Sequence, residues 1–182
     1  LIDIIAPALA KNIDFNRLTQ IPHSFIPDNL REQESDLVFI APYYDQQDKI
    51  EHQVTIYLLI EHQSTPDRVM SFRVLFYMLQ IWDTQRREWL DNKIPKSQWN
   101  FTPILPIVFY NGDKIWDRLL NMTELMELPK ALERFIPHSD IIFMNLKGGT
   151  KREELIATGH PFGWILQVMQ KEHATKQELT EA

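Results

Sequence analysis

The chain contains no cysteine among its 182 residues. This absence excludes disulfide bonds, thiolate zinc sites and a cysteine nucleophile, and it is typical of a reducing compartment. No apolar run reaches the roughly 18 residues that a membrane-spanning helix needs. The first residues also lack a basic stretch followed by an apolar one, the mark of a signal peptide. We therefore expect a cytoplasmic protein that does not enter a membrane.

Familiar catalytic motifs are missing as well. The segment 148–151 (GGTK) lacks the spacing of a phosphate-binding P-loop, and no Gly-x-Gly-x-x-Gly sequence occurs. No serine lies in a Gly-x-Ser-x-Gly motif, and the six histidines form neither an HExxH motif nor a pair spaced i,i+4. The esterase and zinc peptidase mechanisms that depend on these motifs are therefore excluded.

Basic residues are fewer than acidic ones, so the formal net charge is −6 and the sequence pI is near 5.5. This balance argues against a surface that is basic throughout and coats nucleic acid. Residues 67–96 differ, because they carry six basic and four acidic side chains and so have a net charge of +2. The basic residues are Arg68, Arg73, Arg86, Arg87, Lys93 and Lys96. This segment is either a solvated helix face with ordinary ion pairs or a local contact for nucleic acid.

The length and the 44% share of hydrophobic residues predict one globular domain over residues 1–182. We expect residues 1–20 to hold part of an N-terminal helix that Pro7 interrupts. Residues 172–182 are predicted to form a polar tail that is frayed or truncated.

A strand at the centre of the domain is predicted by residues 54–60, an unbroken run of β-branched, aromatic and aliphatic side chains. The run ends at Glu61, and strand alternation sends Glu61 and Gln63 to one face and His62 to the other. Asp36 precedes a second apolar segment, residues 37–41, which is expected to pair antiparallel with the first. Two carboxylates are thereby predicted to lie near each other.

Two converging acids, Asp36 and Glu61, with the backbone carbonyl of His62 have the oxygen ligands that Mg²⁺ or Mn²⁺ prefers. Such a cation suits phosphodiester hydrolysis, because it offsets charge in the transition state. Spacing alone leaves a purely structural role open, since an acid, a strand and Glu-x-Gln also coincide by chance. The His62 side chain is interpreted as packed or capping rather than as a ligand.

A long helix is predicted from Thr65, the expected N-cap, through Pro66 and Asp67 to about Trp89. Arg73 on this helix either pairs with a carboxylate or a phosphate or extends past the edge of the core. Further strands are predicted at residues 104–110 and 141–146. Further helical segments are predicted at residues 122–135, 151–157 and 162–171, and an irregular or edge strand at residues 24–26. This order favours an α/β fold, with a mixed β-sheet flanked by helices on both faces.

Several segments together resemble the Rpn family of bacterial recombination-promoting nucleases or transposases, also called transposase 31 or YhgA-like. The resemblance is carried by residues 30–37 (LREQESDL), 57–67 (YLLIEHQSTPD), 72–82 (FRVLFYMLQIW) and 106–112 (PIVFYNG). That family is similar to PD-(D/E)XK nucleases, so the resemblance implies a restriction-endonuclease-like fold. It also implies a Mg²⁺-dependent DNA endonuclease associated with recombination or mobile elements.

By this resemblance Asp36 and Glu61 bind the metal, and Gln63 occupies the position of the lysine in the motif. Glutamine cannot supply positive charge, so it is expected to orient the attacking water. Arg73 is expected to contact phosphate or to brace Glu61. The expected contacts to DNA backbone are Arg68, Arg86, Arg87 and Lys93. Double-strand cleavage would favour a homodimer, and the alternative is a catalytically silent DNA-binding or protein-interaction module.

Overall fold

The computed structural model describes residues 6–21, 37–45, 47, 49–61, 65–112, 114–117 and 120–146, and for residues 59–61 it describes the backbone alone. Five strands form one sheet in the order β1-β2-β3-β4-β5. Their bounds are β1 (Thr19–Ile21), β2 (Leu37–Tyr44), β3 (Glu51–Glu61), β4 (Ile104–Tyr110) and β5 (Ile142–Asn145). Strands β1, β2 and β3 pair antiparallel, whereas β3, β4 and β5 pair parallel. The predicted mixed α/β sheet is therefore confirmed.

The predicted pairing of the two central segments is also confirmed. Leu37 lies opposite Leu58, and Ala41 lies opposite Val54. Both strands are longer than predicted, so the loop between them shrinks to residues 45–50. Because β2 and β3 are antiparallel, the beginning of β2 lies beside the last third of β3.

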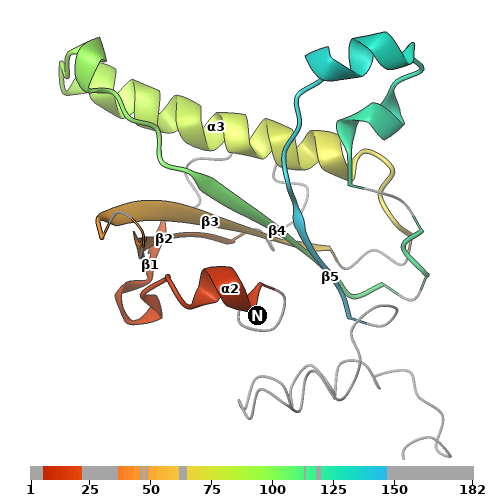
Figure 1. The fold of residues 1–182 in the computed structure, drawn as a ribbon, viewed down its shortest axis with the longest axis horizontal. Coiled ribbons are helices and arrows are strands. Elements are labelled where there is room, and N and C mark those ends of the chain that lie inside the picture. The colour runs from red at the N-terminus through yellow and green to blue at the C-terminus, as the bar shows by residue number, and fades with distance from the viewer. Residues whose placement is uncertain are drawn as a thin grey trace, which may run out of the picture.

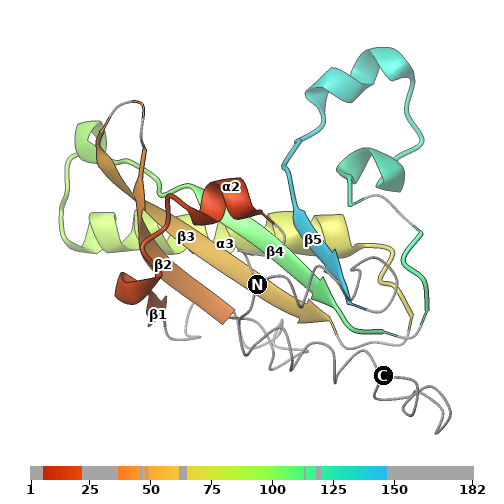
Figure 2. The same cartoon turned by 60° about the horizontal axis from the view of Figure 1, so that its bottom comes forward.

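Helix α3 (Met70–Asp91) connects β3 to β4 and covers one face of the sheet, whereas the short helix α2 (Pro7–Ala10) lies on the other face (Figure 1). Figure 2 shows the five strands side by side, with α2 and α3 on opposite faces. The other helical segments of the described residues are 3₁₀ turns, namely η1 (Phe15–Arg17), η4 (Lys96–Gln98), η5 (Met122–Leu125) and η6 (Lys130–Phe135). No helix within the described ranges is both long and apolar enough to cross a membrane.

The core has two parts, one on each face of the sheet. Beneath α3, Tyr57 of β3 packs on Tyr77 with a distance of 5.5 Å between ring centroids, and Val74 and Val108 are fully buried. On the other face, the core is made by Ala10, Ile13, Ala41, Val54, Ile56 and Ile107. Since alternate side chains of β3 enter the two clusters, the strand is buried on both faces, as its unbroken apolar run predicts.

The predicted start of the long helix is wrong. Thr65 is not its N-cap, because α3 begins at Met70 with Val69 as the capping residue. The Oδ1 atom of Asp67 accepts a hydrogen bond of 2.9 Å from the backbone N–H of Val69. This bond gives the N–H of Val69 an acceptor without a helical turn. It therefore favours a turn rather than a helix over residues 67–69.

The predicted helical region over residues 122–135 is confirmed only in part, because it consists of two separate 3₁₀ turns, η5 and η6, rather than one helix. Pro129 precedes η6, and a proline disfavours helical geometry at the residue before it. The N-terminal helix is reduced to α2 and η1, and β1 follows η1 where no strand was predicted. The predictions for residues 24–26, 151–157, 162–171 and the tail 172–182 lie outside the described residues.

Candidate functional site

The candidate acids lie at the end of the sheet where β3 and β4 finish. Glu61 is the last residue of β3, and its backbone pairs with Tyr110, the last residue of β4. Asp36, His62 and Gln63 lie outside the described residues, as does the side chain of Glu61. No three acidic or histidine side chains cluster to hold a metal ion among the residues whose side chains are described. The predicted ligand set therefore stays a prediction.

Arg73 is the predicted contact that the structure places most clearly. Its Nη1 atom lies 2.9 Å from Oδ2 of Asp67, and only 21% and 17% of the two side chains are exposed. The other carboxylate oxygen of Asp67 accepts the hydrogen bond from the backbone N–H of Val69, so Asp67 binds both Arg73 and Val69. Of the alternatives for Arg73, the structure shows a carboxylate partner, Asp67, and this ion pair ties the first turn of α3 to the segment that precedes the helix. The expected contact of Arg73 with phosphate or with Glu61 stays a prediction.

The loop after β4 brings a lysine to the same end of the sheet. Nζ of Lys114 donates a 3.0 Å hydrogen bond to Oγ1 of Thr65, which follows Glu61 by four residues. The hydroxyl of Tyr110 donates a 3.0 Å hydrogen bond to the carbonyl oxygen of Lys114. Sequence reasoning missed this lysine, although its position four residues after the end of a predicted core strand was a usable signal.

Asn111 also lies at this strand end. Its side-chain oxygen, Oδ1, is buried and accepts no hydrogen bond in the described part of the chain. A buried carbonyl oxygen without a donor is costly, so such an atom is a candidate ligand or acceptor for a bound group. Sequence reasoning assigned Asn111 only to a turn with Gly112.

The predicted DNA contacts do not form one patch. Arg68 is exposed immediately before α3, next to Asp67. Arg86 and Arg87 lie about 24 Å from Met70 along the axis of α3, since each helical residue adds about 1.5 Å. Lys93 is exposed just beyond the end of α3.

Arg86 and Arg87 share one carboxylate at the distant end of α3. Nε of Arg86 lies 2.6 Å from Oδ1 of Asp83, and Nη2 of Arg87 lies 2.5 Å from Oδ2. Hydrogen bonds from these arginines hold the pKa of the Asp83 carboxyl below its ordinary value of 3.8. These two residues therefore match the interpretation of residues 67–96 as a helix face with ordinary ion pairs.

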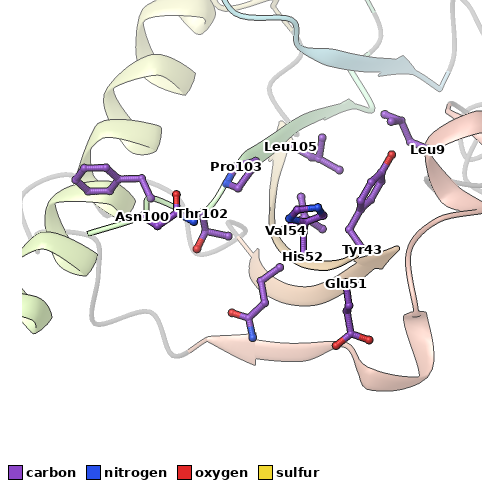
Figure 3. A pocket seen from close by; sticks show the side chains of 11 residues that line it. Leu9, Tyr43, Glu51, His52, Val54, Asn100, Thr102, Pro103 and Leu105 are labelled. Atoms are coloured by element: carbon purple, nitrogen blue, oxygen red, sulfur yellow. The ribbon is translucent and has the colours of Figure 1, made fainter. Parts of the chain in front are cut away.

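A pocket of about 770 Å³ lies away from the candidate acids, near the beginning of β3 (Figure 3). Tyr43 and His52 from the β2–β3 hairpin line it, together with Leu9 and the segment 100–103. Glu51 also borders the pocket, but its carboxylate points to the opposite side of the hairpin. The Glu51 carboxylate is bound by Arg17, with 2.5 Å between Nη2 and Oε2, and this hydrogen bond lowers the Glu51 pKa below 4.5. Glu51 and Glu61 are separated by about 33 Å of extended strand, so this pocket is not the candidate site.

Comparison of the sequence with known protein families shows to which family this chain belongs. The chain matches the family described as "Putative transposase, YhgA-like" over residues 1–181. The chain belongs to this family. It is also 29% identical over 104 residues to the recombination-promoting nuclease RpnA of Escherichia coli strain K12. No solved structure matches the chain.

The match to RpnA covers 54% of this chain and 29% of RpnA, so the chain spans less than a third of that relative. The resemblance of the sequence segments to the Rpn and YhgA-like family is confirmed.

Proposed function

We propose that this YhgA-like chain is a Mg²⁺- or Mn²⁺-dependent DNA endonuclease that uses Asp36, Glu61 and Gln63. The observation that carries the proposal is the family match over residues 1–181, together with the relation to a recombination-promoting nuclease. DNA is the substrate in this proposal, and phosphodiester hydrolysis is the reaction.

The topology of the sheet supports the placement of the site. Leu37, which follows Asp36 in the chain, lies opposite Leu58, three residues before Glu61. Strand β4 ends beside Glu61 because β3 and β4 are parallel and in register to Tyr110. Ligands of α/β sheets bind outside the carboxyl ends of parallel strands, and this is the end of β3 and β4 that the proposal uses.

The donor set fits a hard divalent cation, since Asp36, Glu61 and the backbone carbonyl of His62 offer only oxygen atoms. The buried Oδ1 of Asn111 adds a further oxygen without a described donor at the same strand end. A cation bound there supplies positive charge to the phosphate and acidifies water. In this proposal Gln63 orients the water with its carboxamide, which can donate and accept hydrogen bonds but does not take up a proton at neutral pH.

The ion pairs divide the proposed DNA contacts into two groups. Arg68 has no ion pair or hydrogen bond to another described side chain, so its charge is available to a DNA phosphate near the site. Arg73 is bound to Asp67, so in this proposal it braces the segment before α3 rather than offering a free charge to phosphate. Arg86 and Arg87 would exchange Asp83 for phosphate and therefore contribute less. Lys93 would contact backbone further along the duplex.

The test is nicking of supercoiled plasmid in Mg²⁺ and then Mn²⁺, with EDTA as the blank. Asp36→Ala and Glu61→Ala should lower the nicking rate by about 10³-fold, the scale seen when a transition-state charge partner is lost. Glu51→Ala is the matched control, because Glu51 begins the same strand that Glu61 ends. It should nick at the wild-type rate.

Circular dichroism must show that all variants are folded. Equal nicking by Glu61→Ala and Glu51→Ala would contradict the proposed site. A folded wild type that binds DNA in a salt-dependent way without nicking in either metal would favour the silent DNA-binding module. The predicted homodimer is checked separately by the mass of the protein in solution, with and without DNA.

A further inference from the structure

Arg73 and Lys114 lie at the same end of the sheet but differ in how their charges are compensated. The Arg73 guanidinium is paired with the Asp67 carboxylate at 2.9 Å. The Lys114 ammonium donates to a neutral hydroxyl, that of Thr65, and within the described ranges no carboxylate lies within ion-pair distance of it. Lys114 therefore carries a positive charge that its described neighbours do not neutralise.

The backbone of Lys114 is held by the core. The Tyr110 hydroxyl binds its carbonyl oxygen, and Tyr110 is fully buried. Two residues later, the Trp116 ring packs on Tyr110 with a centroid distance of 5.0 Å and on Phe143 with one of 5.1 Å. The loop that carries Lys114 is thus fixed by contacts to β4 and β5. Because Tyr110 pairs with Glu61, the same contacts fix Lys114 relative to the end of β3.

The exposed side chain of Lys114 makes one hydrogen bond. The Nζ atom has three N–H donors, and Thr65 accepts one of them at 3.0 Å. Thr65 lies between the end of β3 and the start of α3, so the ammonium bridges the segments that follow the two parallel strands. A lysine normally loses considerable rotamer freedom when it binds a ligand, and this hydrogen bond restricts part of that freedom in advance.

We infer that Lys114 binds a phosphate of the DNA substrate at the ends of β3 and β4 and stabilises negative charge on it during hydrolysis. This inference rests on the proposed function for its substrate and its reaction. Its physical basis is that this ammonium, whose charge no carboxylate of the described residues compensates, extends from a loop whose backbone the core holds and favours a phosphodiester oxygen over water. Gln63 cannot supply that charge, and Arg73 already has a carboxylate partner.

Binding and cleavage are measured separately on the full chain. Binding of a fluorescent duplex is followed by anisotropy in EDTA over a series of NaCl concentrations, and nicking is followed in Mg²⁺. Lys114→Gln removes the charge and Lys114→Arg retains it. Lys11→Gln is the matched control, because Lys11 is exposed beside α2, on the other face of the sheet.

We expect Lys114→Gln to reduce the slope of log K against log[NaCl] by about 0.9, the value for one lost phosphate contact. Its nicking rate should fall by about 10²-fold, as when one preorganised donor to the transition state is removed. Lys114→Arg should restore the slope, and Lys11→Gln should match wild type in both assays. Thr65→Val should keep the slope, because the charge remains, and lose less than 10-fold in nicking.

An unchanged salt slope in Lys114→Gln would overturn the inference, whether or not the variant is less stable. An equal loss in Lys11→Gln would also overturn it, because a general effect of net charge would then explain the result. If the wild type binds duplex with a slope that depends on Lys114 but nicks in no metal, the proposed hydrolysis fails and the phosphate contact stands. If Glu61→Ala abolishes nicking while Lys114→Gln changes neither assay, the hydrolysis stands and the inference fails.

Discussion

The two ends of helix α3 each carry an aspartate bound by arginine, yet the surroundings of the two carboxylates differ. At the first end, the exposed fractions of Arg73 and Asp67 are 21% and 17%. At the second end, Arg86 and Arg87 are 43% and 60% exposed around an Asp83 that is 32% exposed. Exposed ion pairs contribute little to stability because water and salt screen them. The first pair therefore fixes structure, whereas the second mainly balances surface charge.

The same contrast applies to the aromatic residues. At the first end, Trp116 is buried against Tyr110 and Phe143 and fixes the loop that carries Lys114. At the second end, Trp99 is half-buried against Trp89, and its indole N–H donates to the carbonyl of Ile94 in the turn after α3. At the first end, the aromatic contacts thus fix the loop that carries the charged residue Lys114. At the second end, the aromatic contacts fix only the turn that follows α3.

The largest effect on stability is expected for Trp116. Trp116→Ala should lower the free energy of unfolding by about 3–5 kcal/mol, because it leaves a cavity among buried rings. Trp99→Ala should cost about 2 kcal/mol, since less of its surface leaves water on folding. Urea unfolding followed by circular dichroism measures both changes. Equal costs would mean that the second end is as well packed as the first.

A smaller effect is expected for the two aspartates. Asp67→Asn keeps the amide oxygen that caps Val69 but removes the charge that binds Arg73, so unfolding should become easier by about 1.5–3 kcal/mol. Asp83→Asn should cost clearly less at the same low salt. Repeating both measurements in 1 M NaCl should abolish the Asp83 effect and leave most of the Asp67 effect. Identical salt responses would contradict the distinction between the two ends.

Strands β3 and β4 could be predicted from the sequence because they are largely buried on both faces of the sheet. The predicted strand at residues 104–110 coincides with β4, and the predicted antiparallel pair coincides with most of β2 and β3. Pro106 lies within β4 without interrupting it. On the side of β4 that faces β5, pairing begins only at Ile107, so β5 is not paired with Pro106, which has no backbone N–H to donate. Apolar runs of strand length therefore predicted β2, β3 and β4, whereas the short strand β1 was missed.

Errors arose where a side chain competes with the backbone or where partners are distant in the chain. Asp67 delays the start of α3 through a hydrogen bond to Val69, which helix propensity alone does not show. Lys114 and Thr65 are separated by 49 positions, and Arg17 and Glu51 by 34. Such contacts follow from strand register and loop path. Because ion pairs depend on such distant contacts, the sequence shows which residues are basic but does not predict which of them have a carboxylate partner.

The smallest effect is the pH dependence at the second end. Arg86 and Arg87 lower the pKa of Asp83 from its ordinary value of 3.8, so between that value and the lowered one the unfolded state binds more protons than the folded state. The stabilisation is therefore present above about pH 4 and is lost as the pH falls through the lowered pKa. The difference in Tm between wild type and Asp83→Asn should be constant from pH 7 to pH 5 and should narrow from pH 4 to pH 2.5. A difference that stays constant over the whole range would show that Asp83 acts through its shape and hydrogen bonds rather than its charge.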